Sequence, residues 1–146
     1  ESAPKYEYYK DPEKTRGSKS KQGYSTLGDV GYVDEEGYLY LTDRKAFMII
    51  SGGVNIYPQE TEDCLITHPK VADVAVIGIP HPKWGETVKA FVVCRQGMAI
   101  GEKEVIDFCK QYLASYKKPT VVAFVPEIPR NPSGKALKRI LKEEGQ

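Results

Sequence analysis

Apolar and polar positions separate a short N-terminal hairpin from the rest of the chain. Residues 1–23 are mostly polar with little periodicity, so we expect a loop there. Two short apolar runs, 30–33 and 38–41, flank the turn sequence 34–37, a pattern typical of a β-hairpin. The apolar run 47–50 predicts a further short strand, which stops at a pair of glycines.

After residue 57 the period changes, and strands are expected to alternate with helices. Three segments are apolar and rich in β-branched side chains, which predicts buried strands. They are residues 71–79, 89–95 and 121–125. Three others carry apolar residues at helical spacing, which predicts amphipathic helices. They are residues 58–68, 102–113 and 136–144. This order implies an α+β fold, in which a small sheet is covered by helices.

The two parts of the chain meet near residues 44–47. The hairpin before this point has too little apolar material to fold alone, because two strands are marginal in isolation. The part after it, about 100 residues, is long enough for a domain with its own core. We therefore predict that residues 1–44 are the tail of a larger N-terminal domain and that residues 45–146 form a second domain.

Composition excludes several classes of protein. The 146 residues are 40% apolar and 28% charged, as is usual for a globular protein, and the net charge of +1 gives no general attraction to nucleic acid or anionic membranes. No apolar run reaches the roughly 18 residues that span a bilayer. The three cysteines and two histidines lack metal-ligand spacing, so we expect no metal site, reduced thiols and a cytosolic protein.

The hairpin carries a first pair of candidate binding residues. Asp29 follows Gly28 at the start of the hairpin, and Arg44 ends it. A carboxylate suits the hydroxyls of a ribose, and a guanidinium suits the same sugar or its phosphate. Taken alone, the pair is a weak signal, and a turn aspartate and a surface arginine explain it more simply.

Two glycine-containing loops are further candidates. The glycines of residues 51–53 let a ligand approach the backbone, but the segment matches neither a dinucleotide-binding fingerprint nor a P-loop. In residues 131–135, Pro132 and Gly134 fix a loop that places Lys135 near the start of the last predicted helix. A lysine there suits an anion. A plain turn and a solvated lysine are the alternatives.

Together and in this order, these motifs resemble the last third of AMP-forming acyl-CoA ligases, in the ANL superfamily with luciferases and peptide-synthetase adenylation domains. The resemblance covers residues 4–143. The motifs are Gly28-Asp29, Thr42-Asp43-Arg44, Ser51-Gly52-Gly53-x-Asn55, His68-Pro69-x-Val71-x-Asp73, His81-Pro82-x-Trp84-Gly85-Glu86 and Pro132-Ser133-Gly134-Lys135.

The resemblance implies a reaction in two steps. A carboxylic acid, expected to be a fatty acid, reacts with ATP to give an acyl-adenylate, and CoA then displaces AMP. Lys135 matches the lysine that contacts the carboxylate and the α-phosphate. Asp29 and Arg44 match the residues that hold the AMP ribose. ATP, CoA and Mg²⁺ are the implied substrates and ion.

The resemblance also implies that the second domain rotates about a hinge at Ala46 and so brings the 52–53 loop to the CoA thiol. The positions that match this loop and the CoA contacts are Gly52, Gly53, Asn55, Trp84, Tyr116 and Lys118. A large N-terminal domain is the implied partner, because it carries the phosphate-binding loop and the acyl pocket. The chain alone is therefore expected to be inactive.

The chain departs from the family at two positions. Ala46 replaces the usual Asp or Lys of the hinge, and Leu27 replaces the usual Thr before Gly28. Two other functions stay open: an adenylation domain that serves a carrier-protein thiol, and a catalytically silent interaction module. An RNA-binding domain is disfavoured, because its central strands would present aromatic side chains that are largely missing here.

Overall fold

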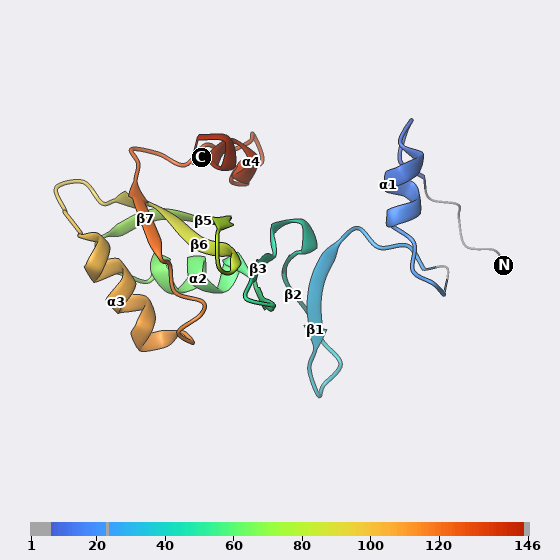
Figure 1. The fold of residues 1–146 in the computed structure, drawn as a ribbon, viewed down its shortest axis with the longest axis horizontal. Helices are drawn as coiled ribbons and strands as arrows, with labels where there is room; N and C mark the ends of the chain where they lie inside the picture. The colour runs from blue at the N-terminus through green and yellow to red at the C-terminus, as the bar shows by residue number, and fades with distance from the viewer. Residues whose placement is uncertain (1–6, 23, 145–146) are drawn as a thin grey trace. The chain divides into compact units, whose positions relative to one another are not determined.

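A computed structural model describes residues 7–22 and 24–144, with the side chains of residues 42–44 and 144 outside the description (Figure 1). The chain divides into two compact units, Glu1–Ala46 and Phe47–Gln146. The division falls within a short 3₁₀ helix, η1 (Lys45–Phe47).

The first unit begins its described part with a short helix, α1 (Pro12–Gly17). The Asp11 carboxylate accepts a hydrogen bond of 2.9 Å from the Lys14 N–H, and a proline occupies the first turn. Both features favour the start of a helix. The expectation of an uninterrupted loop over residues 1–23 is therefore wrong at this helix.

The rest of the first unit is the predicted hairpin, β1 (Asp29–Val33) and β2 (Leu39–Arg44), which pair antiparallel. At its turn the Asp34 carboxylate accepts the N–H groups of Glu36 and Tyr38, at 3.0 and 2.9 Å. The hydrogen bond from Tyr38 lowers the pKa of Asp34. Large apolar side chains on this hairpin are more than half exposed. They include Tyr32, Val33, Tyr38, Leu39 and Leu41.

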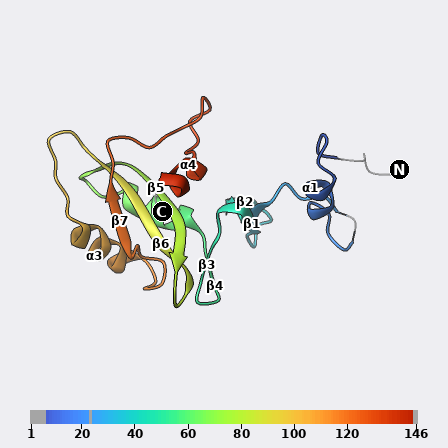
Figure 2. The same cartoon turned by 45° about the horizontal axis from the view of Figure 1, so that its top comes forward.

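The second unit is a five-stranded mixed sheet with helices on both faces (Figures 1 and 2). Its strands are β3 (Ile49–Ser51), β4 (Val54–Ile56), β5 (Val71–His81), β6 (Gly85–Cys94) and β7 (Val121–Phe124). Its helices are α2 (Pro58–Ile66), α3 (Glu102–Tyr112) and α4 (Lys138–Glu144). The central strand β6 pairs antiparallel with β5 along one side. On its other side it pairs parallel with β7 and, at its first residue, antiparallel with β3. The α+β fold and the hairpin before it are confirmed.

Alternate residues of β5 and β6 enter two separate cores. Val74 and Val76 of β5 pack in the core that includes residues of α2 and α3. Ala75 and Ile77 pack in the other core, together with Leu141 of α4. Because side chains alternate across a strand, the sheet is covered by α2 and α3 on one face and by α4 on the other (Figure 1).

One strand and several element boundaries differ from the sequence prediction. Strand β4 was not predicted, because the glycines of residues 52–53 turn the chain back on itself rather than into a helix. Strand β6 begins at Gly85 instead of residue 89. Helix α4 begins at Lys138 instead of residue 136, because Ala136 still bridges Arg130 as extended chain.

Candidate functional site

The loop that carries Lys135 is closed by hydrogen bonds of its own. The Asn131 side-chain oxygen accepts the N–H groups of Ser133 and Lys135, at 3.1 and 2.9 Å, and the Ser133 hydroxyl at 2.8 Å. Gly134 has a φ of +81°, which favours glycine. The backbone of this loop is thus fixed, while the Lys135 side chain is exposed.

Arg130 fastens this loop to the sheet. Its guanidinium contacts both carboxylate oxygens of Asp73 on β5, at 2.6 and 3.2 Å, and donates to the Gly134 carbonyl at 2.6 Å. Such a bidentate pair fixes geometry as well as adding energy. Asp73 and Arg130 therefore position Lys135. Sequence reasoning missed this role, because 57 residues separate the pair.

Lys135 stands farther from a helix than the sequence predicted. The helix α4 starts three residues later, and the intervening Leu137 N–H donates to the Pro129 carbonyl at 2.8 Å. Among the described residues no hydrogen bond or ion pair engages the Lys135 ammonium, so it projects from a rigid loop as an available cation. Such a cation is suited to phosphate or carboxylate oxygens.

The second glycine loop is the two-residue turn between β3 and β4. Gly52 and Gly53 have φ values of +57° and +82°, as a type I′ hairpin turn requires. The Gly52 N–H donates to the Trp84 carbonyl at 2.8 Å. A Cβ on Gly52 would lie 2.9 Å from Cε3 of the Trp84 ring, so the indole rests directly on this glycine. Asn55 follows in β4 and is exposed.

The turn between β5 and β6 supports this glycine loop. The Nδ1 atom of His81 accepts the N–H groups of Lys83 and Trp84, each at 3.2 Å, and the Lys83 ammonium lies 4.6 Å from the Trp84 ring centroid. His81 thus caps this turn through its side chain. His68 likewise caps its own turn, since its Nδ1 atom accepts the Lys70 N–H at 3.2 Å.

The segment that contains Tyr116 and Lys118 reaches the same end of the sheet. Just after this segment, the Thr120 N–H donates to the Val88 carbonyl at 2.9 Å, and the Thr120 hydroxyl lies 2.7 Å from that of Thr87. The segment therefore enters the sheet beside the start of β6, close in sequence to Trp84.

The three polar side chains of residues 116–118 differ in availability. The Lys117 ammonium pairs with the Glu60 carboxylate of α2, which neutralises its charge. Within the part of the chain that the structure describes, Lys118 Nζ donates only to the Ser115 carbonyl, at 3.1 Å, and Tyr116 is 52% exposed. Lys118 is therefore the better candidate for an anionic ligand.

The two glycine loops lie at opposite ends of β5. The Lys135 loop is tied to Asp73 near its beginning, and the Gly52–Gly53 turn contacts the chain just after His81 at its end. Eight residues of extended chain separate Asp73 from His81, a span of about 26 Å at roughly 3.3 Å per residue. Figure 2 shows the β3–β4 turn beside the β5–β6 turn, well away from the chain that leads from β7 to α4.

The predicted ribose-binding residues are paired in the backbone register of the hairpin in the first unit. The hairpin register makes Asp29 and Arg44 direct partners across the two strands. Asp29 is exposed, and the Arg44 side chain lies outside the described residues. Ala46 is the last residue of the first unit, so the predicted hinge coincides with the division of the chain. Leu27 is 63% exposed.

The three cysteines are free thiols. Burial raises the pKa of Cys109 to about 12 and also raises the pKa of its neighbour Cys64. Within the described residues, no group of three His, Cys, Asp or Glu side chains is arranged to hold a metal ion. No helix in the described part of the chain has the length and apolar character needed to cross a bilayer.

Comparison with known proteins identifies the family. Residues 60–135 match the AMP-binding enzyme C-terminal domain. The chain is 48% identical to the long-chain-fatty-acid–CoA ligase FadD13 of Mycobacterium tuberculosis, over 94% of this chain and 27% of that protein. It is 46% identical to a 2-succinylbenzoate–CoA ligase of Bacillus cereus, over 84% of this chain and 25% of that one.

A solved structure agrees in fold. ATP-bound MatB from Rhodopseudomonas palustris superimposes with a TM-score of 0.83 at 40% identity, over 91% of this chain and 26% of MatB. The chain thus spans about a quarter of the length of these relatives. The family match runs from α2 to Lys135 and so includes both Asp73 and Trp84. The chain belongs to the AMP-binding enzyme C-terminal domain family, and the relatives that identify it include acyl-CoA ligases.

Proposed function

We propose that this chain is the C-terminal portion of an AMP-forming acyl-CoA ligase, which joins a carboxylic acid to CoA through an acyl-adenylate. The observation that carries the proposal is the separation of the two glycine loops by about 26 Å of β5. One loop presents a lysine cation, and the other presents two glycines without side chains beside an exposed indole. A domain built this way offers one loop to each half-reaction in turn.

Lys135 serves the first half-reaction. As the carboxylate attacks the α-phosphorus of ATP and pyrophosphate leaves, negative charge is shared among the phosphoryl oxygens. An ammonium group held in place by a rigid loop therefore stabilises the transition state more than the ground state. Asp29 accepts hydrogen bonds from the ribose hydroxyls, and Arg44 joins it from the opposite strand.

The opposite end of β5 serves thioester formation. Gly52 and Gly53 let the pantetheine arm pass close to the backbone, and Asn55 borders this turn. Trp84 and Tyr116 offer exposed rings to the nucleotide part of CoA. Because Lys117 is neutralised by Glu60, Lys118 receives the 3′-phosphate. Rotation of the second domain about Ala46 withdraws the Lys135 loop and brings the Gly52–Gly53 turn to the CoA thiol.

The partners follow from these roles. The acid is a fatty acid, because the relatives include a long-chain-fatty-acid–CoA ligase. Mg²⁺ accompanies ATP, and the described residues offer it no ligand cluster of their own. The chain works with a larger N-terminal domain of the same protein and is inactive alone. Its free thiols suit the reducing cytosol.

The test is to express the full-length protein and measure pyrophosphate release with a panel of fatty, aryl and dicarboxylic acids. We expect release with fatty acids and acyl-CoA as the product. Product formed on a carrier-protein thiol but not on CoA contradicts the ligase assignment and favours a carrier-dependent adenylation domain. Turnover by residues 1–146 alone contradicts the inactivity of the isolated chain.

A further inference from the structure

The turn that carries Gly52 and Gly53 is weakly attached to the sheet. Strand β3 pairs with β6 at a single position, Ser51 with Gly85. The base of the β3–β4 hairpin is fixed by the buried side chains of Ile49 and Ile56. Its tip therefore depends on a few contacts with the chain around β6.

Glu86 makes one of these contacts. In a two-residue hairpin turn the flanking residues Ser51 and Val54 exchange hydrogen bonds, so the next N–H, that of Ile50, points away from β4. The Glu86 carboxylate accepts this N–H through Oε2 at 2.8 Å. An ionised acceptor makes this hydrogen bond about twice as strong as a neutral one.

The sheet leaves room for the Glu86 side chain to make this contact. Glu86 pairs with Pro80 across the strands, and Gly78 is its diagonal neighbour on the same face. A Cβ on Gly78 would lie 2.9 Å from Oε1 of Glu86. The carboxyl group thus lies over Gly78 of β5, in space that the side chain of any other residue at position 78 would occupy.

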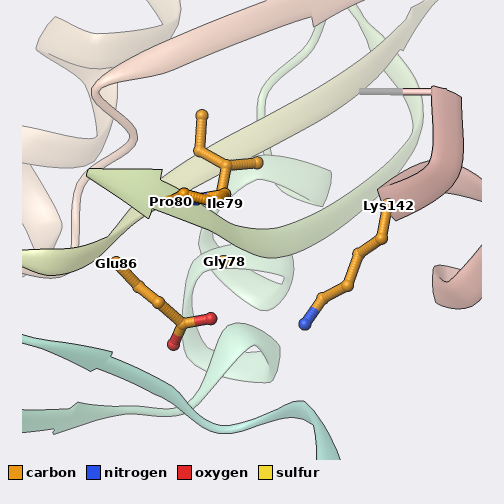
Figure 3. A pocket seen from close by; sticks show the side chains of 5 residues that line it. All are labelled: Gly78, Ile79, Pro80, Glu86 and Lys142. Carbon is orange, nitrogen blue, oxygen red and sulfur yellow. The ribbon is translucent and has the colours of Figure 1, made fainter. Parts of the chain in front are cut away.

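The Glu86 side chain borders a small cavity that is also lined by Lys142. The cavity measures about 170 Å³ and is lined by Gly78, Ile79, Pro80, Glu86 and Lys142. Figure 3 shows the Glu86 carboxylate and the Lys142 ammonium reaching toward the same space.

On the other side of the turn, His81 forms a hydrogen bond with Trp84, and Trp84 in turn contacts Gly52. The imidazole accepts the Trp84 N–H at 3.2 Å, the Trp84 carbonyl accepts the Gly52 N–H at 2.8 Å, and the indole covers Gly52. Two residues therefore fix the Gly52–Gly53 turn. Trp84 contacts its first glycine, and Glu86 binds the backbone of β3, the strand that leads into it.

We propose that Glu86 is a positioning residue for thioester formation, which sets the Gly52–Gly53 turn through its hydrogen bond to Ile50. The inference rests on the proposed function. Because the Lys135 loop lies at the opposite end of β5, Glu86 acts on the second half-reaction and leaves the first unchanged. A small misplacement of groups around a reacting centre lowers its rate by up to about 10²-fold.

The experiment compares Glu86→Gln with Glu86→Met in the full-length protein. Both are close to glutamate in length, but only glutamine keeps an acceptor for the Ile50 N–H. Pyrophosphate release reports adenylation, and conversion of supplied acyl-adenylate and CoA to acyl-CoA reports the second step. Asp73→Ala, on the neighbouring strand β5 at the end that supports the Lys135 loop, is the matched control.

We expect Glu86→Met to slow the second step by roughly 10-fold, with pyrophosphate release within about 2-fold of wild type and Glu86→Gln intermediate. For Asp73→Ala we expect slower pyrophosphate release and an unchanged conversion of acyl-adenylate to acyl-CoA. Equal loss in both steps, or no loss in either, overturns the role of Glu86 while the proposed function stands. A wild-type protein that performs neither step contradicts the proposed function and this inference together.

Discussion

The ion pair between Glu62 and Lys138 ties α4 to α2 and to the sheet, a short distance along the chain from Lys135. The Glu62 carboxylate accepts the Lys138 ammonium at 2.7 Å and the Val76 N–H at 2.7 Å. The two charged side chains are only 12% and 9% exposed. The ammonium also lies 5.3 Å from the centre of the Phe47 ring, next to the hinge position.

Replacing Glu62 by Gln keeps an acceptor for the Val76 N–H but leaves the Lys138 cation buried without a counter-charge. Breaking a buried pair in this way costs about 3–5 kcal/mol. Lys138→Met leaves the Glu62 carboxylate with its backbone hydrogen bond, so we expect a smaller loss of about 1–3 kcal/mol. The double variant removes both charges and is expected within about 1.5 kcal/mol of wild type.

The assay is urea unfolding of residues 1–146, followed by the fluorescence of Trp84, the only tryptophan of the chain. Because Trp84 belongs to the second unit, its signal reports the unit that holds the pair. A Glu62→Gln loss below about 1 kcal/mol refutes the reasoning, and so do single losses that simply add in the double variant.

Three further predictions follow from the site. Asp73→Ala releases Arg130, and we expect adenylation, measured as pyrophosphate release, to fall roughly 10-fold. Gly52→Ala places a Cβ 2.9 Å from the Trp84 ring at a φ of +57°, so we expect slower acyl-CoA formation from supplied acyl-adenylate, with adenylation retained. Because burial raises the pKa of Cys109 to about 12, the fold favours the neutral thiol. Its stabilising effect is complete below the ordinary thiol pKa and declines as the pH rises toward 12. Unfolding free energies should therefore fall less steeply above pH ~9 in Cys109→Ala, and equal slopes contradict the assignment.

Periodicity alone was enough to predict the main elements of the second unit. β5, β6 and α3 lie within a few residues of their predicted bounds, because each contributes a continuous apolar face to a core. Strand β4 was missed, because only one of its three residues is buried. Helix α1 was missed because its start depends on Asp11 and a proline rather than on an apolar face.

The site was predicted in part for a similar reason. Local motifs marked Lys135 and the Gly52–Gly53 turn, since glycines and a lysine leave a signal within a few residues. The supports of both loops come from distant strands. The pairing of Arg130 with Asp73, and that of Glu86 with Ile50, is set by strand order and register. These partners become visible only once the sheet is assembled.

The most direct test of the whole account is the effect of Lys135→Ala on the two half-reactions of the full-length protein. The account predicts that pyrophosphate release falls roughly 10²-fold or more, because a cation is lost from the phosphoryl oxygens in the transition state. It also predicts that supplied acyl-adenylate is still converted to acyl-CoA at the wild-type rate. Unchanged pyrophosphate release, or equal loss of both steps, contradicts the division of labour between the two ends of β5.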